Sequence, residues 1–386
     1  MASRAERSPF NEWWWTIDRL LLGAVVTLML VGVVLLLAAS PAVAERIGIN
    51  NMFHFVNRQG LFLLPAFGVM IGVSFLSPRD IRRLALLVFA VSVALVIATL
   101  LFGAEVKGSR RWIIGIQPSE ILKPAFVILA AWFFSERIKR SDMPGNLLAV
   151  LLLAVSAGLL ILQPDFGQTM LLAVVWGALF FMAGLHWFWM FGLGGIGAGG
   201  IAAAYAFIPH VTKRIDRFLN PEGADTFQVD TAMESILGGG WFGKGPGEGT
   251  VKRILPDSHT DFIMAVSAEE FGILFCMVVV LLFAFVVLRG LRHAIKLDDP
   301  FCRFATAGLT LLFGLQSSIN LMVNLHMMPA KGMTLPFISY GGSSLVAVAY
   351  AMGMVLGLTR RRPRSHAIAR AWSESEASDR LRPELA

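Results

Sequence analysis

The stretch "RLLLGAVVTLMLVGVVLLLAASP" (19–41) is predominantly apolar and carries no charge after its first residue. A helix needs about 20 consecutive apolar residues to cross the hydrocarbon core of a bilayer. Strands of an outer-membrane barrel would be only about ten residues long and would alternate between apolar and polar positions. The stretch therefore predicts a transmembrane α-helix.

Apolar runs of the same kind recur along the chain, in agreement with its composition. Of the 386 residues, 56% are hydrophobic and 15% are charged, whereas ordinary globular domains carry about 25% charged residues. The predicted fold class is an all-α polytopic membrane protein with about ten transmembrane helices and one large extracytoplasmic loop. The predicted spans are 19–41, 59–77, 83–103, 119–135, 146–163, 168–184, 187–208, 262–288, 303–325 and 335–358.

The chain divides into three predicted regions. Residues 1–18 form a cytoplasmic N-terminal segment, and residues 19–358 form the ten-helix membrane domain, which includes the extracytoplasmic loop 209–261. Residues 359–386 form a cytoplasmic tail that is rich in Ser, Glu, Arg and Ala. Because such a composition buries little apolar surface, we expect the tail to be disordered.

Basic residues in the short connections predict the orientation, because Lys and Arg are enriched on the cytoplasmic side. With the N-terminus inside, the inside segments are all basic: 77–83, 135–140, 289–296 and 360–364. We therefore expect both termini in the cytoplasm. Basic loops are also the commoner cause of a net charge of +7 in a membrane protein, and we expect no nucleic-acid partner.

Two segments on the predicted outer side are basic as well. One is "EVKGSRRW" (105–112), and the other is the loop 209–261. The basic residues of this loop are Lys213, Arg214, Arg217, Lys244, Lys252 and Arg253. These charges are either solvated or bind an anionic ligand at the outer surface. We favour the ligand, with phosphate or pyrophosphate as a natural candidate.

The loop also contains a glycine-rich run, "SILGGGWFGKGPGEGT" (235–250). It superficially fits a phosphate-binding P-loop, but the required Ser or Thr is replaced by Gly245, and a helical membrane protein offers no preceding buried strand. The glycines instead allow tight turns whose N–H groups are available to an anion. The alternative is a mobile connector.

The stretch "LPDSHTDFIMAVSAEEFG" (255–272) places acids around the start of the eighth predicted span. Asp261 can be a helix N-cap or a general base, and the spacing alone does not separate these roles. Glu269 and Glu270 are expected about two turns deeper in the membrane. They would pair with a basic group such as Lys123, line a cavity wall or couple to protons.

Two further motifs carry polar groups into predicted spans. In "IQPSEILKP" (116–124), Glu120 and Lys123 are spaced to pair on one helix face. The pair either stabilises the structure or is part of a site. In "MPAKGMTLPFISYGGSS" (328–344), Pro336 and the Gly341–Gly342 pair predict a broken or kinked helix at a cavity.

In this order the motifs resemble the SEDS family, the polytopic proteins of bacterial shape, elongation, division and sporulation. The resemblance covers most of the chain. The last motif is most similar to the division, FtsW-type branch, and the sporulation branch is similar there. The matching stretches are "VKGSRRWI" (106–113), "QPSEILKP" (117–124), "LQPDFG" (162–167), "RIDRFLNP" through "FQ" (214–228), "GGGWFGKGPGEG" (238–249), "LPDSHTDFIMAVSAEEFG" and "PAKGMTLPFISYGGSS".

The resemblance implies a peptidoglycan glycosyltransferase of the inner membrane that polymerises lipid II at its outer face, at the division septum. It implies a class B penicillin-binding transpeptidase and other divisome membrane proteins as partners. It also implies that Asp261 is catalytic. The substrate-binding residues that we predict are Arg111, Trp112, Glu120, Lys123, Arg217, Gln228, His259, Lys331 and Ser343.

No organic cofactor is expected. A divalent cation, Mg²⁺ or Mn²⁺, could share the stabilisation of the leaving pyrophosphate, although no ligand cluster for it can be read from the sequence. Two alternatives to the enzyme remain at this point. One is a lipid II flippase or other transporter, which ten spans and intramembrane acids would suit. The other is a noncatalytic scaffold for a septal transpeptidase.

The chain departs from the family pattern at two places. Only "IG" (114–115) separates "RWI" from "IQPSE", so the outer loop before the fourth span must be tight. Asp257 stands where Glu is more usual, which keeps the charge but shortens its reach.

Overall fold

The computed structural model describes residues 8–106, 109–140, 142–184, 187–208, 211–212, 215–216, 227–329 and 332–360. The chain forms two units, residues 1–18 with 360–386 and residues 19–359. In the first unit, helix α1 (Pro9–Thr16) is capped by the hydroxyl group of Ser8, which accepts the N–H of Asn11. The described candidate site residues all belong to the second unit.

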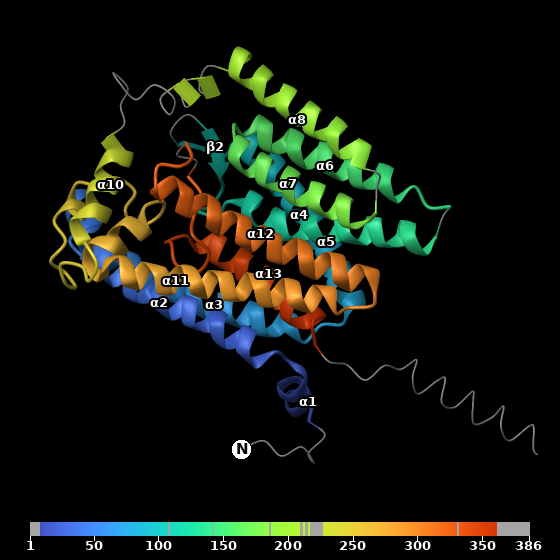
Figure 1. Ribbon diagram of the computed structural model, residues 1–386, viewed down its shortest axis with the longest axis horizontal. Helices are drawn as coiled ribbons and strands as arrows, with labels where there is room; N and C mark the ends of the chain where they lie inside the picture. Colours follow the sequence, from blue (N-terminus) through green and yellow to red (C-terminus); the bar gives the residue numbers. More distant parts are fainter. Residues whose placement is uncertain are drawn as a thin grey trace, which may run out of the picture. The chain divides into compact units, whose positions relative to one another are not determined.

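The second unit is built almost entirely of helices (Figure 1). A two-stranded antiparallel hairpin and a short 3₁₀ helix complete it. Its elements are α2 (Arg19–Arg46), α3 (His54–Ser74), α4 (Pro78–Phe102), β1 (Ala104–Val106), β2 (Ser109–Trp112), α5 (Pro118–Lys139), α6 (Gly145–Leu162), α7 (Phe166–Met182), α8 (Trp187–Phe207), α10 (Phe227–Gly239), η1 (Val251–Arg253), α11 (Ile263–Ile295), α12 (Pro300–Asn324) and α13 (Gly342–Leu358).

Each of the ten predicted spans corresponds to a helix, so the all-α fold class is confirmed. Six of these helices are long and apolar enough to cross a membrane by length and composition, namely α2, α3, α4, α6, α11 and α12. The number of helices that span stays a prediction. The last span differs most at its start: α13 begins at Gly342, and residues 333–341 before it are not helical. A non-helical segment there agrees with the break predicted from Pro336 and the glycine pair.

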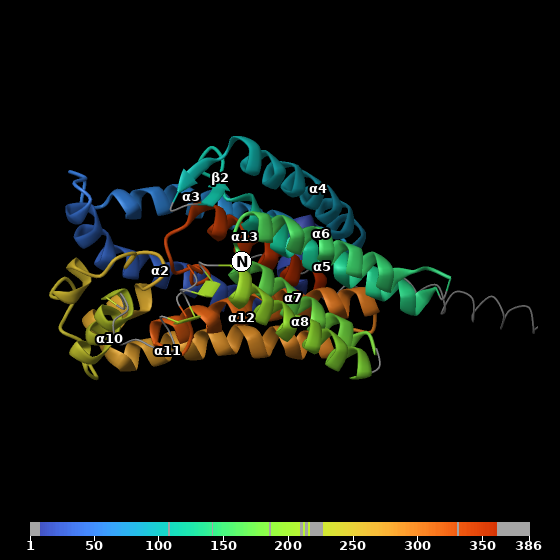
Figure 2. The same ribbon diagram turned by 90° about the horizontal axis from the view of Figure 1, so that it is seen from above.

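Helix α5 lies in the middle of the unit. It contacts α4, α6, α7, α12 and α13, and its first half is almost completely buried. Figure 2 shows α4 and α11 on opposite sides of the unit, with α5, α12 and α13 between them. Polar side chains on the first turns of α5 are therefore enclosed by other helices.

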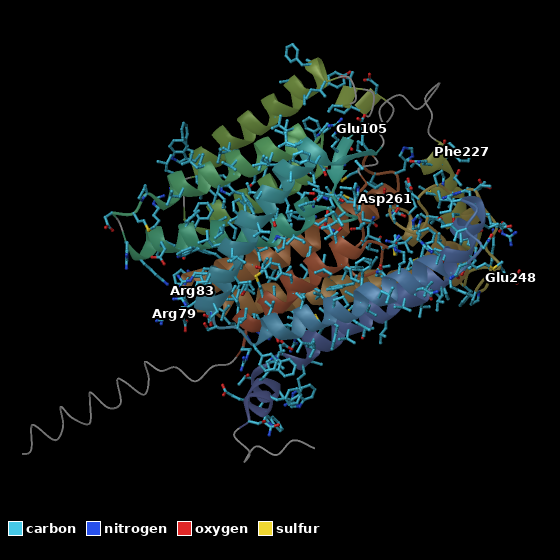
Figure 3. All side chains as sticks on the ribbon, turned by 180° about the vertical axis from the view of Figure 1, so that it is seen from behind. Arg79, Arg83, Glu105, Phe227, Glu248 and Asp261 are labelled. Carbon is cyan, nitrogen blue, oxygen red and sulfur yellow. The ribbon has the colours of Figure 1, made fainter. Side chains whose placement is uncertain are left out.

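The predicted inside connections gather at one end of the helices, which we call the basic end. Arg82 at the start of α4 pairs with Glu136 near the end of α5 at 3.3 Å. Lys139 at the end of α5 pairs with Asp299, which precedes α12, at 2.7 Å. Figure 3 shows Arg79 and Arg83 at this end and Asp261 toward the other. Three of the four basic connections thus lie on one side, as the predicted topology requires.

The tight loop between β2 and α5 is a two-residue turn, separate from the β1–β2 hairpin. Ile113 and Ile116 exchange two backbone hydrogen bonds of 3.0 and 2.9 Å. Between them, Ile114 and Gly115 both have positive φ angles, 51° and 73°. Two residues with positive φ are the mark of a type I′ turn, which suits the twist of a hairpin. The short "IG" spacing is accommodated in this way.

Helix α11 is not one straight helix. Gly272 has φ 84° and ψ 172°, which no helix accommodates. The Sγ atom of Cys276 lies 3.5 Å from the Oγ atom of Ser267 and 3.9 Å from the carbonyl oxygen of Met264. In a straight helix those pairs would be about 14 and 18 Å apart along the axis. The chain therefore reverses at Gly272, and residues 263–271 run antiparallel to residues 273–295.

This reversal corrects the predicted eighth span, 262–288. Only residues 273–295 run alongside the other long helices, and residues 263–271 lead outward from Asp261. Glu269 and Glu270 are consequently farther out than Asp261, not two turns deeper as the sequence predicted. The apolar run gave no sign of the reversal, because a glycine within a transmembrane helix is common.

Candidate functional site

Asp261 lies just before the first turn of α11 and is half-buried. The N-cap position of this helix is Phe262, so the alternative role of Asp261 as the N-cap is wrong. The carbonyl oxygen of Asp257 accepts the N–H groups of Thr260, Asp261 and Phe262 at 3.1, 3.1 and 3.3 Å. Asp257 has φ 51°, a conformation that Asp tolerates better than most residues. This explains why Asp serves at a position where the family pattern has Glu.

Two amides of α12 hold the backbone of Asp261. Its carbonyl oxygen accepts hydrogen bonds from the Nδ2 atoms of Asn320 and Asn324, at 3.0 and 2.8 Å. Both asparagines are buried. Asn320 also donates to the carbonyl oxygen of Met333 at 2.6 Å. Asp261 is thus fixed against the last turn of α12, at the end of the helices opposite the basic end.

Residues 332–341, which we call the re-entry segment, lie beside Asp261. The N–H of Tyr340 donates to the carbonyl oxygen of His259 at 2.9 Å, and the hydroxyl group of Ser339 donates to the carbonyl oxygen of Thr260. Gly332 lies so near that a Cβ atom built on it would be 3.6 Å from Oδ2 of Asp261. The carboxylate therefore borders the re-entry segment.

The predicted site residues His259 and Ser343 lie around this segment. The imidazole ring of His259 packs against the rings of Phe55 and Tyr340, with centroid distances of 4.4 and 5.5 Å. Ser343 is half-buried in the first turn of α13. The hydroxyl group of the next residue, Ser344, makes the hydrogen bond with Thr334, at 2.7 Å. The substrate-binding role predicted for Ser343 stays a prediction, and the serine that bonds to the re-entry segment is its neighbour Ser344.

A second polar group, the buried polar cluster, forms around Lys123. Its ammonium group has three acceptors: Glu120 at 2.9 Å, Gln168 at 2.9 Å and Gln316 at 3.1 Å. The amide of Gln168 donates to Glu120 at 2.9 Å. The predicted Glu120–Lys123 pair is confirmed, and it joins α5 to α7 and α12. The Lys123 ammonium group thus donates two hydrogen bonds to amide oxygens and is balanced by one buried carboxylate.

The cluster connects to the re-entry segment on one side and to the hairpin on the other. Gln316 donates to the carbonyl oxygen of Thr334 at 3.0 Å. On the other side, Arg111 forms an ion pair with Asp165 at 3.5 Å and donates to the carbonyl oxygen of Gln163 at 3.0 Å.

Asp165, just before α7, interacts electrostatically with Arg111, Glu120 and Lys123. Burial raises the pKa of its carboxyl group above the ordinary value, while the Arg111 guanidinium opposes this and Glu120 adds to it. The structure therefore brings Arg111, Glu120 and Lys123 into one network. Gln168, Gln316, Asn320 and Asn324, which complete these contacts, were not singled out in the sequence. Four amide side chains on two apolar helices were the signal that could have revealed them, because buried amides need partners.

Two basic residues of the predicted outer loop have internal partners that the sequence did not reveal. Lys244 pairs with Glu269 at 3.1 Å, and Lys252 forms a buried ion pair with Glu270. The acids thus pair with basic groups, as one of the alternatives predicted, but the partners are Lys244 and Lys252 and not Lys123. Lys244 and Lys252 balance acids of the chain, which removes them from the set of charges attributed to an anionic ligand.

The last residue of the glycine-rich run and the first two residues of η1 present N–H groups to an anion, and that anion is a side chain of the chain itself. The carboxylate of Glu269 accepts the N–H groups of Thr250, Val251 and Lys252 at 2.7, 2.8 and 2.9 Å. The N–H of Lys244 donates to the Glu269 carbonyl oxygen at 2.8 Å, and that of Ile273 donates to the Gly240 carbonyl oxygen at 3.0 Å. The run is thus hydrogen-bonded to the chain on both sides of the reversal at Gly272. We call this run, residues 235–250, the clasp.

The remaining predicted residues lie apart from these contacts or outside the described residues. Trp112 is 36% exposed at the end of β2, and Gln228 is exposed in the first turn of α10. Arg217 and Lys331, like Lys213 and Arg214, lie outside the described residues. Among the described residues, no three His, Cys, Asp or Glu side chains form a group that could hold a metal ion. The divalent cation stays a prediction, and no step below depends on it.

Residues 18–363 match the model of the cell cycle protein family that comprises FtsW, RodA and SpoVE. The chain belongs to this family. The resemblance read from the seven motifs is confirmed by a match that covers nearly the whole chain.

Relatives and solved structures of the family agree. The chain is 48% identical to a probable peptidoglycan glycosyltransferase FtsW of Caulobacter vibrioides, over 94% of each chain. It is 33% identical to the protein of that name in Geobacter sulfurreducens, over 89% of this chain and 95% of the relative. Its fold matches a chain of a peptidoglycan synthase complex with a TM-score of 0.75 at 27% identity, covering 90% and 98% of the two chains. The RodA protein of Thermus thermophilus matches with a TM-score of 0.66 at 26% identity, over 91% and 99%.

Proposed function

We propose that this chain is an FtsW-type peptidoglycan glycosyltransferase that polymerises lipid II into β-1,4-linked glycan at the outer face of the cytoplasmic membrane. Membership of the FtsW, RodA and SpoVE family supports the activity, and a relative at 48% identity bears that activity in its name. The observation that carries the site is that half-buried Asp261, whose backbone is held by two buried amides, lies at the end opposite the basic connections.

Asp261 is the general base in this proposal. The carboxylate takes the proton from the 4-hydroxyl group of the acceptor sugar as that oxygen attacks the anomeric carbon of the donor. The bond from this carbon to the lipid pyrophosphate breaks, and undecaprenyl pyrophosphate leaves. One displacement from an α-linked donor gives the β linkage by inversion. A positioned base of this kind contributes roughly 10²- to 10⁴-fold to the rate.

The roles of the basic residues follow from their contacts. Lys123 pairs with Glu120 and donates to Gln168 and Gln316, so it acts by holding α5, α7 and α12 together. Arg111 is partly exposed and paired with Asp165. It supplies positive charge at the outer end, where charge develops on the leaving pyrophosphate.

The membrane setting and the partner also belong to the proposal. The chain is a multi-pass membrane protein, and we place its basic end in the cytoplasm and its action at the division septum. The fold neighbour that belongs to a peptidoglycan synthase complex supports a partner enzyme that crosslinks the glycan. A class B penicillin-binding transpeptidase is the partner that we propose.

The test is polymerisation of purified lipid II by the purified chain, alone and with its transpeptidase. Wild-type protein is expected to give long glycan strands, and Asp261→Asn is expected to reduce the rate at least about 10²-fold. Asp257→Asn serves as the matched control, since it changes a neighbouring acid without removing the proposed base. Wild-type rates for Asp261→Asn in a normally folded protein would reject the assignment.

A parallel assay of lipid II translocation in vesicles separates the enzyme from a flippase. Translocation without polymerisation would favour the transporter. Complementation by Asp261→Asn, with the transpeptidase still bound, would favour a scaffold.

A further inference from the structure

A cavity of about 410 Å³ lies between the outer half of α2, the clasp and the tip of the reversal at Gly272. Among the described residues that line it, none belongs to the site proposed for glycosyl transfer. The cavity is therefore a separate candidate for a ligand-binding site.

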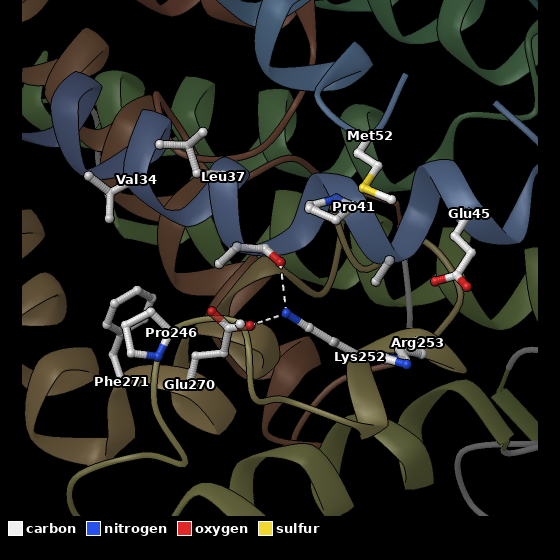
Figure 4. Close-up of a pocket in the computed structure, with 13 residues that line it drawn as sticks. Val34, Leu37, Pro41, Glu45, Met52, Pro246, Lys252, Arg253, Glu270 and Phe271 are labelled. Atoms are coloured by element: carbon white, nitrogen blue, oxygen red, sulfur yellow. Dashed lines mark hydrogen bonds and ion pairs between the residues drawn. The ribbon is translucent and has the colours of Figure 1, made fainter. Parts of the chain in front are cut away.

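One end of the cavity is apolar. Val34 and Leu37 on α2 line it together with Phe271, and these two α2 side chains are 46% and 44% exposed. Exposed apolar side chains on a membrane-spanning helix face lipid chains. Figure 4 shows Val34, Leu37 and Phe271 toward one end of the cavity.

The other end carries opposite charges. Glu45 and Arg253 line this end, and both are exposed. Figure 4 places them away from Val34 and Leu37 along α2. From Val34 to Glu45 the helix rises about 16 Å, which is roughly half the thickness of the bilayer core. The cavity thus has the polarity and length of a lipid molecule in one leaflet.

The wall between the two ends contains an unsatisfied acceptor. Glu270 is 1% exposed, and its Oε1 atom pairs with Lys252. Lys252 also donates to the carbonyl oxygen of Ala38 at 3.0 Å. The Oε2 atom of Glu270 is buried and accepts no hydrogen bond from the described residues. In Figure 4 this oxygen is turned away from Lys252. Leaving a buried carboxylate oxygen without a donor is costly, so the occupant should bring one.

We propose that this cavity binds a phospholipid with a primary ammonium head group, such as phosphatidylethanolamine. The phosphate pairs with Arg253, the ammonium group donates to Oε2 of Glu270, and an acyl chain lies over Val34 and Leu37. The two acids and two bases of the cavity balance, as does a zwitterionic head group. A quaternary choline head group has no N–H to donate, so the site discriminates against it.

The experiment is native mass spectrometry of the full-length protein from micelles with equal amounts of phosphatidylethanolamine, phosphatidylcholine and phosphatidylglycerol. Wild-type protein is expected to retain one phosphatidylethanolamine about tenfold over phosphatidylcholine, the effect of one charge-assisted hydrogen bond. Leu37→Trp fills the apolar end and should abolish retention. Leu30→Trp is the matched control: it lies on the same helix, is 59% exposed and does not line the cavity.

The head group is tested separately. Arg253→Gln should weaken retention of phosphatidylethanolamine, because the phosphate loses its partner, while Arg110→Gln, an exposed arginine on the hairpin outside the cavity, should leave retention unchanged. Equal retention of the three lipids by wild-type protein would overturn the ammonium assignment. Retention unchanged by Leu37→Trp would overturn the site. Loss of a co-purifying membrane protein in Leu37→Trp, with lipid retention intact, would assign the cavity to a partner helix instead. None of these readouts depends on glycosyltransferase activity.

Discussion

The thiol of Cys276 lies 3.5 Å from the hydroxyl group of Ser267, although nine residues separate them in one apolar run. The contact exists because the chain reverses at Gly272. A Cβ atom at Gly272 would lie 2.4 Å from the carbonyl oxygen of Trp241 and 2.5 Å from the nitrogen of Gly243. The clasp therefore requires glycine at this position for both conformation and space.

We predict that Gly272→Ala lowers the free energy of unfolding by at least about 2 kcal/mol, since the φ/ψ region is essentially restricted to glycine and the clasp must shift. Thermal unfolding in detergent, followed by tryptophan fluorescence, measures the loss. Gly177→Ala in α7 is the matched control, because a Cβ atom there meets nothing within 4 Å. It should be neutral or stabilise by up to about 1 kcal/mol. Equal melting temperatures for both variants would contradict the reversal.

The buried ion pair between Lys123 and Glu120 leads to a second prediction. Lys123→Met leaves the carboxylate of Glu120 buried without its counter-ion, which should cost about 3–5 kcal/mol. The double variant Lys123→Met with Glu120→Gln removes both charges and should recover most of this loss. A double-mutant cycle of unfolding free energies measures the coupling.

The same double variant separates structural from direct action of Lys123. If Lys123 only holds the helices together, the double variant polymerises lipid II at a rate within about tenfold of wild type. A stable double variant without activity would instead show that the ammonium group contacts the pyrophosphate.

The sequence predicted those features that depend on neighbouring positions. Run length located the ten helices, and the spacing of Glu120 and Lys123 placed them on one face. The reversal at Gly272 depends on hydrogen bonds from residues 240–245, about thirty positions earlier, and the local pattern carries no trace of them. Lys244 and Lys252 looked like an anion site for the same reason: their partner acids lie in a different element.

The ion pair between Lys139 and Asp299 gives a pH-dependent prediction. Burial alone would raise the pKa of Asp299, but the hydrogen bonds from Lys139 and the N–H of Cys302 hold its pKa below the ordinary value. The stabilisation is therefore complete above the unfolded-state pKa of about 4 and is lost as the pH falls through the lower folded-state pKa.

Asp299→Asn keeps an acceptor for the N-cap of α12 and removes the ion pair. At pH 7 it should cost about 0.5 kcal/mol, the value of an exposed pair, and the difference from wild type should shrink below about pH 4 and vanish below the folded-state pKa. Asp299→Ala also removes the cap and should cost about 1 kcal/mol more. Unfolding curves at pH 7 and at the lowest pH at which the protein stays folded provide the measurement. A stability difference between wild type and Asp299→Asn that grows on acidification would contradict the predicted direction of the pH dependence.

The hairpin turn before α5 can be improved. Ile114 has φ 51° and is 95% exposed, so a β-branched residue adopts a left-handed conformation without burying its side chain. Ile114→Asn creates the Asn–Gly pair that type I′ turns favour and should raise the free energy of unfolding by about 1 kcal/mol. Ile116→Asn, at a position without positive φ, should bring no gain. A melting temperature unchanged or lowered by Ile114→Asn would show that the turn does not limit stability.

In the proposed mechanism, the amides of α12 act on catalysis through the position of Asp261. The amide of Asn320 donates hydrogen bonds to the carbonyl oxygens of both Asp261 and Met333. Asn320→Ala should therefore let the carboxylate shift relative to the acceptor hydroxyl group, and a displacement of about 1 Å can cost 10²-fold in rate. We expect kcat for lipid II polymerisation to fall about 10- to 100-fold with little change in KM.

Ser317→Ala is the control for this last prediction. Ser317 is a buried polar residue one turn earlier on α12, and its hydroxyl group donates only to the carbonyl oxygen of Phe313 within the same helix, at 2.8 Å. Its loss should leave kcat unchanged. An equal fall in both variants would mean that the rate reports general damage to α12, and a rise in KM alone for Asn320→Ala would mean that the amide binds substrate. Only a fall in kcat confined to Asn320→Ala supports a positioning role, because that residue alone of the two reaches across from α12 to the backbone of the proposed base.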